Sequence, residues 1–134
     1  MSEKEERQVK QVIVMRKDLG MRKGKMIAQG AHASVGMILR MQEYFRNMRK
    51  YVDHWEEPFN SWVGGTFTKV CVSVDSDEEL LRIFNEAQDA DLPVNIITDA
   101  GRTEFHGVPT RTCLAIGPYW SDNIDKITGK LTLL

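Results

Sequence analysis

The chain has 134 residues, of which 42% are hydrophobic and 28% are charged, a composition typical of a single globular domain. Its formal net charge of −1 excludes a uniformly basic nucleic-acid-binding protein. The charge is unevenly distributed: residues 1–52 carry 12 Lys and Arg against 5 Asp and Glu, and residues 53–134 carry 6 against 14. A local basic surface is therefore expected in the first half of the chain.

The apolar runs are too short to cross a bilayer, and the charged residues 1–10 lack the apolar core of a signal peptide. Cys71 and Cys113 each lie in an apolar, strand-like run, which favours buried reduced thiols in a cytosolic protein over a disulfide. No His or Cys spacing resembles a zinc site. We therefore expect a cytoplasmic protein without a metal ion or a membrane partner.

The first half of the chain predicts an arm, a strand and a long helix. Residues 1–9 are polar and are expected to form a flexible arm before a single domain of residues 10–134. A continuous β-favouring run over residues 12–15 predicts a buried strand. Residues 24–50 have helical periodicity and small residues that let the helix lie close to a sheet or a ligand. The expected buried stripe of this helix is Ile27, Ala31, Ser34, Ile38, Met41 and Phe45.

The middle of the chain predicts a loop, a strand and a second helix. Residues 51–65 contain Asp, Pro, Asn and Gly residues that break any period, so a loop held down by three aromatic side chains is expected. A second strand is expected over residues 67–74. Ser76 and Glu79 have the spacing of a capping box, which predicts the start of a helix.

The last third predicts two strands and a short helix. The strands are expected over residues 93–98 and 112–116, the second ending at the Gly-Pro pair, and residues 121–128 are expected to form a helix closed by Gly129. No helical pattern connects these two strands, so the fourth strand is expected to be antiparallel. The prediction is an α/β protein: a three-layer α/β/α sandwich with a small mixed four-stranded sheet.

A basic turn over residues 16–25 joins the first strand to the first helix. At about 100° per residue, Lys25, Gln29 and His32 share one face of that helix close to its N-terminus. The positive pole of a helix suits a phosphate or a developing oxyanion, so this face is interpreted as a site. The alternatives are ordinary solvated charge for the turn and a packed core residue for His32. The basic residues concerned are Arg16, Lys17, Arg22, Lys23 and Lys25.

A second polar cluster begins at Asp99, directly after the third predicted strand. Sites in open α/β sheets gather outside the carboxyl ends of the strands, and the basic turn leaves the same end of its own strand. Asp99 is therefore expected to face Lys25 and His32 across a cleft, where a carboxylate could orient an imidazole or a water molecule. The alternative for Asp99 is a simple turn residue before Gly101.

Four motifs begin, in order, at Arg16, Asp99, Thr112 and Ile124. They read Arg-x-Asp-Leu-x-Met-x-x-Gly-Lys-x-x-Ala-Gln-x-x-His-Ala, Asp-Ala-Gly-Arg-Thr, Thr-x-Leu-x-Ile-Gly-Pro and Ile-Asp-Lys-Ile-Thr-Gly-Lys-Leu. In this arrangement the chain resembles the type 2 peptidyl-tRNA hydrolases, typical of archaea and eukaryotes, over residues 10–134. The resemblance implies an α/β/α fold, a homodimer, no metal or organic cofactor, and cleavage of the ester between a peptide and the tRNA 3′ end. No DNA is expected as a partner.

The resemblance also implies an active site and shows departures from the family pattern. Gly30 and Ala31 stand where the family often has Cys and Ser, and the loop after Asp99 is one residue longer than usual. Residues 41–65 are long for the family and form a possible added element. The residues associated with the active site are Lys25, His32, Asp99, Thr103 and Thr112.

The expected chemistry assigns water activation to His32 backed by Asp99, although these two roles could be exchanged. Lys25 and the helix N-terminus would stabilise the oxyanion, and the two threonines would bind substrate or water. A non-catalytic RNA- or protein-binding module is the alternative function. A serine esterase is disfavoured, since the chain has no Gly-x-Ser-x-Gly elbow. The residues expected to bind tRNA are Arg16, Lys17, Arg22, Lys23, Gln29 and Arg102.

Overall fold

The computed structural model describes residues 7–102 and 104–134. Residues 1–6 of the predicted arm, and Thr103 among the predicted catalytic residues, lie outside the described residues. Within the described part, the sheet has four strands: β1 (Val9–Arg16), β2 (Lys69–Val74), β3 (Val94–Asp99) and β4 (Thr110–Trp120).

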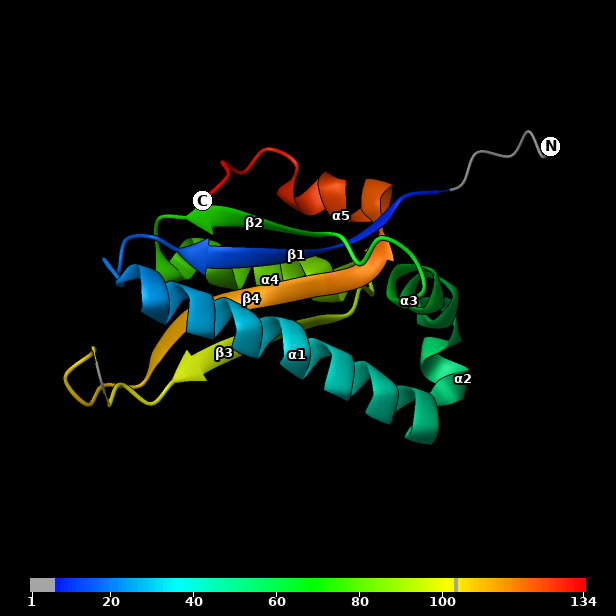
Figure 1. The fold of residues 1–134 in the computed structure, drawn as a ribbon, viewed down its shortest axis with the longest axis horizontal. Coiled ribbons are helices and arrows are strands. Elements are labelled where there is room, and N and C mark those ends of the chain that lie inside the picture. The colour runs from blue at the N-terminus through cyan, green and yellow to red at the C-terminus, as the bar shows by residue number, and fades with distance from the viewer. Residues whose placement is uncertain (1–6, 103) are drawn as a thin grey trace.

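The strands lie in the order β2-β1-β4-β3 (Figure 1). β2 is parallel to β1, whereas β4 is antiparallel to both of its neighbours, β1 and β3. The mixed sheet and the antiparallel fourth strand are therefore confirmed. β1 and β3 run in the same direction, so their carboxyl ends reach the same end of the sheet.

Helices cover both faces of the sheet. One face carries α1 (Lys23–Asn47), followed by α2 (Arg49–Val52), the 3-10 turn η1 (Asp53–Trp55) and α3 (Glu56–Val63). The other carries α4 (Asp77–Asp89) and α5 (Ser121–Thr128). Figure 1 shows α1 crossing in front of β4 and β3, with α4 behind the sheet. The three-layer α/β/α sandwich is confirmed.

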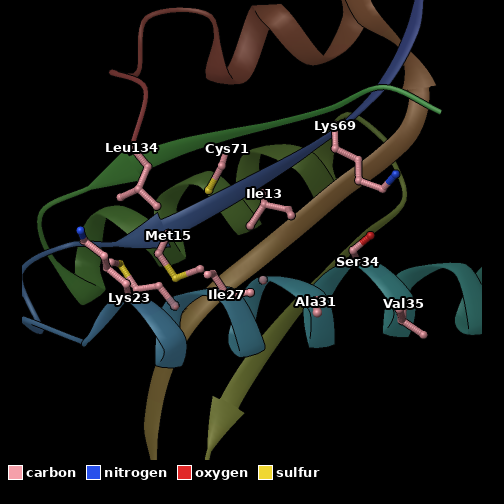
Figure 2. A pocket seen from close by; sticks show the side chains of 12 residues that line it. Ile13, Met15, Lys23, Ile27, Ala31, Ser34, Val35, Lys69, Cys71 and Leu134 are labelled. Atoms are coloured by element: carbon pink, nitrogen blue, oxygen red, sulfur yellow. The ribbon is translucent and has the colours of Figure 1, made fainter. Parts of the chain in front are cut away.

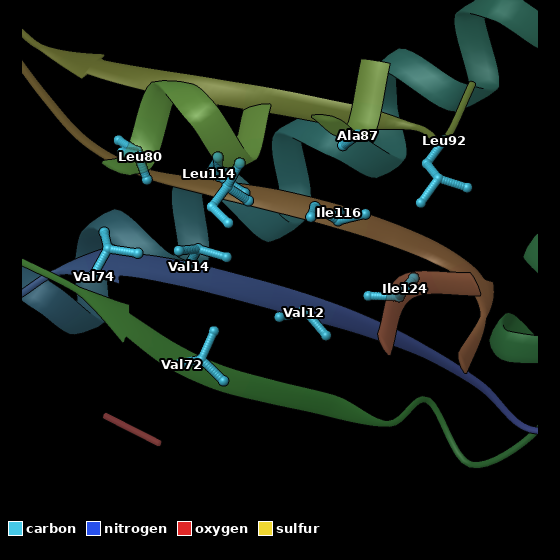
Figure 3. Packing of buried hydrophobic residues seen from close by; sticks show 11 residues of the cluster. Val12, Val14, Val72, Val74, Leu80, Ala87, Leu92, Leu114, Ile116 and Ile124 are labelled. Atoms are coloured by element: carbon cyan, nitrogen blue, oxygen red, sulfur yellow. The ribbon is translucent and has the colours of Figure 1, made fainter. Parts of the chain in front are cut away.

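Alternation along the strands supplies a separate core to each face. Val12 and Val14 of β1 lie with Leu114 of β4 in the core against α4 and α5 (Figure 3). Met15 of β1 and Cys113 of β4 point the opposite way, into the core against α1 and α3. Leu114 and Val14 are 0% exposed, and complete burial of such a side chain contributes about 1.5–3 kcal/mol. Both faces of the sheet are thus held by apolar burial.

The N-terminus of α4 is capped as its sequence predicts. The Ser76 Oγ accepts a hydrogen bond from the Glu79 main-chain N–H at 3.0 Å, and a cap of this kind stabilises a helix by about 1 kcal/mol. The Glu79 side chain in turn accepts from the Asp75 N–H at 2.8 Å, one residue upstream of the expected partner. The start of this helix is therefore confirmed.

The predicted loop over residues 51–65 is wrong, because this segment is mostly helical. Pro58 lies in the first turn of α3, where its missing N–H costs no helical hydrogen bond. Trp55 and Trp62 are 7% and 0% exposed, and their indole N–H groups donate to main-chain carbonyls. The free energy gained by burying these aromatic side chains outweighs the preference of the loop-forming residues for irregular structure. Only the glycines after α3 end the helical segment.

Two further expectations need correction. The fourth strand does not end at the Gly-Pro pair, because a register shift opposite Lys10 lets β4 continue to Trp120. The predicted stripe of α1 is wrong at Ile27, which is 72% exposed, and at Ala31, which is also exposed. The helix instead turns small residues toward the sheet, which allows a closer approach. Its buried residues are Gln29, Gly30, Ala33, Ser34, Met37 and Met41.

As a consequence, an apolar groove lies between α1, β1, β2 and the end of the chain (Figure 2). Ile27 and Val35 line its helical side, and Ile13, Cys71 and Leu134 line the opposite side. The C-terminal residues reach it because they pair with β2 through an antiparallel bridge between Val72 and Leu133.

Candidate active site

Helix α1 and strand β3 bring a lysine, an amide and a carboxylate together. The Lys25 Nζ lies 2.9 Å from the Asp99 Oδ1, and the Gln29 Nε2 donates to the same oxygen at 3.3 Å. The Gly101 N–H donates to the Asp99 Oδ2 at 2.8 Å. The side chains of Lys25 and Asp99 are 15% and 14% exposed. The expected meeting of Lys25 and Asp99 at the end of the sheet is therefore confirmed.

The electrostatics of this cluster follow from its donors. The Lys25 ammonium, and then the N–H of Gly101 and the amide of Gln29, lower the pKa of Asp99 below its usual value against the opposing effect of burial. Asp99 is therefore ionised at neutral pH. The aromatic ring of Phe105 lies 5.7 Å from the Lys25 Nζ, so the ammonium is covered on one side.

Gln29 is the centre of the cluster, and it is buried at 6% exposure. Since Asp99 is acceptor-only, the NH₂ group of Gln29 must face it, and the Gln29 Oε1 must face the other way. There the hydroxyl of Thr112, which is 0% exposed, donates to Oε1 at 2.5 Å. Thr112 thus contacts Gln29 and fixes the orientation of the amide that holds Asp99.

The turn after β3 depends on a glycine. Gly101 has a φ of +84°, and a Cβ at this position would collide with the main chain of Val108. The close approach of this loop to itself is held by the Gly107 N–H, which donates to the Gly101 carbonyl at 2.8 Å. Only glycine fits the position that also supplies an N–H to Asp99.

His32 lies on α1 one turn beyond Gln29 and is exposed to solvent. In the described part of the chain, no hydrogen bond or ion pair joins His32 to Asp99 or to another residue. The structure therefore brings together Lys25, Gln29, Asp99 and Thr112, and the expected contact of His32 with Asp99 is not among the hydrogen bonds of the described residues. We refer to the four bonded residues as the lysine–aspartate cluster.

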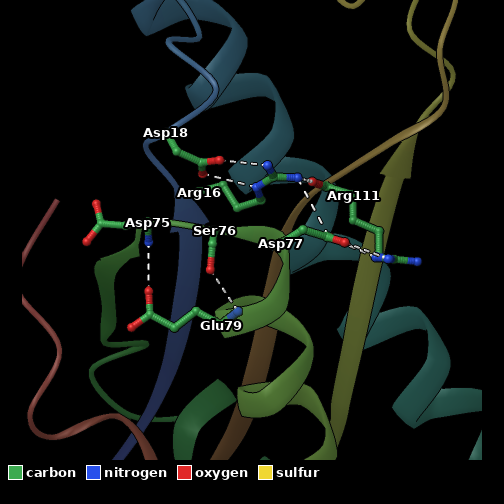
Figure 4. Close-up of polar contacts among 7 residues, drawn as sticks. All are labelled: Arg16, Asp18, Asp75, Ser76, Asp77, Glu79 and Arg111. Carbon is green, nitrogen blue, oxygen red and sulfur yellow. Dashed lines mark hydrogen bonds and ion pairs between the residues drawn. The ribbon is translucent and has the colours of Figure 1, made fainter.

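Arg16, which was expected to bind tRNA, lies in a second network at the same end of the sheet (Figure 4). Its guanidinium donates twice to Asp18, at 3.1 and 2.7 Å, and once to the Arg111 carbonyl at 3.0 Å. The Arg111 guanidinium donates twice to Asp77, at 2.9 and 2.6 Å. These four residues, here called the arginine network, join β1, β4 and the start of α4.

The residues that were expected to bind tRNA differ in how far solvent reaches them. Gln29 is buried and the Arg16 side chain is only 11% exposed. Arg22 is 85% exposed, with Glu104 at 3.4 Å, and Lys17 is 49% exposed, with Asp75 at 3.6 Å. Those that solvent reaches are Lys17, Arg22, Lys23 and Arg102.

Some residues of this region were not singled out from the sequence. Arg111 and Asp77 lie 34 residues apart, and no local pattern indicates their pairing. Phe105 lies in the loop that covers Lys25, and only the proximity of that loop to Asp99 in the sequence could have indicated it. Among the described residues, no group of three His, Cys, Asp or Glu side chains could hold a metal ion.

The fold and the cluster together define a class of protein: an α/β/α sandwich with a mixed sheet in which a cation and a carboxylate lie side by side near a helix N-terminus. No helix among the described residues is long and apolar enough to cross a membrane.

Comparison with known proteins narrows this class. The family model of peptidyl-tRNA hydrolase PTH2 matches residues 9–134. The chain is 44% identical to the peptidyl-tRNA hydrolase of Methanocaldococcus jannaschii over 126 residues, 94% of this chain and 100% of the relative. It is 40% identical to those of Metallosphaera sedula and Saccharolobus islandicus, over 94% of this chain and at least 99% of each relative. The chain belongs to the PTH2 family of peptidyl-tRNA hydrolases, which confirms the resemblance.

Proposed function

We propose that this chain hydrolyses the ester bond between a peptide and the 3′ end of tRNA. The observation that carries this proposal is the ion pair of Lys25 and Asp99, held at 2.9 Å beside the N-terminus of α1. The described helix α1 has no acidic residue in its first turn and no side-chain cap. The positive pole of the helix is thus left for an anionic substrate or intermediate.

Ester hydrolysis needs a water molecule that attacks the carbonyl carbon and a cation for the oxygen that becomes negative. The Lys25 ammonium serves as that cation, because it lies in a partly enclosed site where its charge is poorly screened. As the tetrahedral intermediate collapses, the bond to the ribose oxygen breaks, and that oxygen takes up the proton that the attacking water gave to the general base. The products are a peptide with a free carboxylate and tRNA with a free hydroxyl.

Asp99 is the group that we assign to orient the attacking water. A carboxylate has about four acceptor positions, and three hydrogen bonds from described residues reach Asp99. No further donor among the described residues reaches Oδ2, and we assign its second acceptor position to water. His32 is the second candidate for the general base. A kcat/KM that stays level as the pH falls below 6 favours the carboxylate of Asp99 as the base, whereas a kcat/KM that declines over that range favours His32.

Thr112 and Gln29 act as positioning residues in this proposal. Both are buried, so neither meets substrate directly in the arrangement described above. Their hydrogen bonds hold the Asp99 carboxylate against Lys25. Thr103 follows the same strand end in the sequence, and we propose that it binds substrate or water there.

The tRNA is proposed to bind across the exposed cations around the site. Lys17, Arg22 and Lys23 precede or open helix α1, and Arg102 lies in the loop that follows Asp99. Contacts of Lys and Arg with phosphates release counterions, so this binding weakens steeply with salt. We expect RNA rather than DNA as the partner, and a cytoplasmic location, because peptidyl-tRNA is formed in translation.

We further propose that the chain forms a homodimer. Ile27, Val35 and Leu39 are 72%, 57% and 61% exposed and lie along one side of α1. A row of apolar side chains of this kind is typical of a surface that another protein covers. Sedimentation at several concentrations measures the mass directly, and Val35→Glu should reduce it to that of one chain if this row is the interface.

The central experiment is hydrolysis of N-acetyl-aminoacyl-tRNA by the purified chain with EDTA present. We expect release of the N-acetyl amino acid at an unchanged rate, because the proposed mechanism uses no metal or cofactor. Binding of the tRNA without release of the amino acid would favour a binding module instead. Activity that vanishes with EDTA and returns with a divalent ion would contradict the mechanism.

A further inference from the structure

The sheet has two edge strands, and the chain treats them differently. At the β2 edge, the Ser73 N–H donates to the Thr132 carbonyl at 2.9 Å, and the Leu134 N–H donates to the Cys71 carbonyl at 3.1 Å. The C-terminal residues thus cover that edge, beside β2 in Figure 1. At the other edge, no segment of the described residues pairs with the outer side of β3.

The register shows which main-chain groups of β3 are left open. The Gly117 N–H donates to the Pro93 carbonyl at 2.9 Å, so the main-chain carbonyl of Pro93, directly before β3, points toward β4. Hydrogen-bonded pairs alternate along an antiparallel ladder, so the main-chain N–H and C=O of Asn95 also point toward β4. Val94 and Ile96 therefore direct their N–H and C=O groups outward. Such open groups are a template for an added strand.

The helix that packs on this part of the sheet covers its face and not its edge. A Cβ on Gly36 of α1 would lie 3.2 Å from the Asn95 Nδ2, so the helix lies directly above the side chains of β3. His32 is on the same side of α1, between Gln29 and Gly36, and is exposed. A chain running along the outer side of β3 would pass His32 before it reaches the cluster.

The open edge leads to the site. β3 spans Val94–Asp99 and ends at the carboxylate that Lys25 and Gln29 hold. Its six residues cover about 16 Å at roughly 3.3 Å per residue. A peptide bound along it would have about five residues in contact, followed directly by the group that lies at Asp99.

We propose that the peptide part of peptidyl-tRNA binds as an added strand along the outer edge of β3. This inference rests on the proposed function. The substrates differ in sequence, and main-chain hydrogen bonds are the one recognition that all peptides share. The direction is fixed by chemistry: the carboxyl end of the peptide carries the ester and lies at Asp99, which is the carboxyl end of β3. The peptide therefore runs parallel to β3.

The first test varies the length of the peptide. N-acetyl-aminoacyl-tRNA reaches only the cluster, whereas tetrapeptidyl-tRNA also reaches Ile96. Two or more added hydrogen bonds should raise kcat/KM roughly tenfold between these substrates, with a plateau beyond about five residues. Equal kcat/KM for all lengths would overturn the added strand and leave the proposed function intact, because hydrolysis of the shortest substrate tests that function separately.

The second test uses the alternation of a strand. Tetrapeptidyl-tRNAs that carry a single N-methyl group, placed at each peptide nitrogen in turn, lose one donor at a time without any change to the enzyme. In an added strand only every second N–H points to β3, so kcat/KM should fall about fivefold at alternate positions and little at those between. Uniform losses, or none, would show that the peptide does not pair as a strand.

A second copy of the chain is the competing occupant of this edge. Val94→Pro removes one outward N–H, and proline is tolerated on the open side of an edge strand. We expect this variant to keep its mass in solution and its activity on N-acetyl-aminoacyl-tRNA but to lose about threefold in kcat/KM on hexapeptidyl-tRNA, which is long enough to reach Val94. A variant that instead loses mass in sedimentation, with no change of peptide-length dependence, would assign the edge to a second copy.

Discussion

The lysine–aspartate cluster and the arginine network lie at the same end of the sheet and contain the same kinds of charge. In both, a basic side chain lowers the pKa of a carboxyl group: Lys25 that of Asp99, and Arg111 that of Asp77. A lowered pKa therefore does not distinguish a reactive site from a structural one in this protein. The difference lies in how the hydrogen bonds are distributed.

In the arginine network each guanidinium makes two parallel bonds to a carboxylate of its own. Such forks are rigid and hold both groups in a fixed plane. In the lysine–aspartate cluster, Asp99 is shared among an ammonium, an amide and a main-chain N–H. The ammonium is a point charge on a flexible stem, and it can turn toward a developing oxyanion. The first arrangement fastens three elements together, and the second leaves groups for a substrate.

The largest expected effect separates the two regions directly. Lys25→Ala and Asp99→Ala should each lower kcat/KM tenfold or more, which is about 1.4 kcal/mol or more of transition-state stabilisation. Asp77→Asn is the matched control: it removes a carboxylate with a lowered pKa from the same end of the sheet and should leave kcat/KM within about twofold. Circular dichroism checks that all three variants fold. Equal losses in the three variants would abolish the distinction between the regions.

A smaller effect tests whether Thr112 acts through Gln29. Thr112→Val keeps the shape of the side chain but leaves the Gln29 Oε1 without its buried donor, which costs about 1–3 kcal/mol in the positioning of the amide. We expect kcat to fall about five- to tenfold, with little change in KM, and Thr112→Ser to restore it. A loss of folded enzyme would also lower the apparent kcat without changing KM, so circular dichroism first checks that Thr112→Val is folded. A folded Thr112→Val variant with the kcat of the unmodified chain would contradict the positioning role.

A still smaller effect is expected at the exposed cations outside both regions. Arg22→Ala with Lys23→Ala should raise KM severalfold and leave kcat nearly unchanged, because phosphate contacts hold the ground state and the transition state alike. The slope of log affinity against log salt should flatten by up to about two contacts. Arg40→Ala with Arg46→Ala, two exposed residues in the half of α1 that lies away from the site, changes the net charge by the same amount and serves as the control. If the Arg22 and Lys23 variant keeps its salt slope, the tRNA does not bind at this end.

These regions also show how much of the structure can be predicted from the sequence. The fold class, the antiparallel fourth strand and the meeting of Lys25 with Asp99 follow from periodicity and from the rule that strand ends gather at one edge. The helical character of residues 51–65 does not, since it depends on the burial of Trp55 and Trp62 against distant parts of the chain. Arg16 was expected to bind tRNA together with Lys25, although it lies in the arginine network. The sequence could not show this, because Asp77, which lies 3.6 Å from the Arg16 guanidinium and pairs with Arg111, is remote in the sequence.

The pH dependence of stability gives the smallest effect and isolates the arginine network. The Arg111 guanidinium is the main cause of the lowered pKa of Asp77. A carboxylate of this kind contributes stability above its unfolded pKa of about 3.9, and the contribution is lost as the pH falls through the lower folded value. Because both partners are partly exposed, at 41% and 36%, solvent screening keeps this contribution to about 1 kcal/mol or less. Asp77→Asn should therefore lower Tm by about 2–4 °C at pH 7 and by progressively less below pH 4. Thermal unfolding followed by circular dichroism at pH 3, 5 and 7 measures this, and a deficit that is as large at pH 3 as at pH 7 would show that the variant is destabilised by lost packing and not by the lost charge.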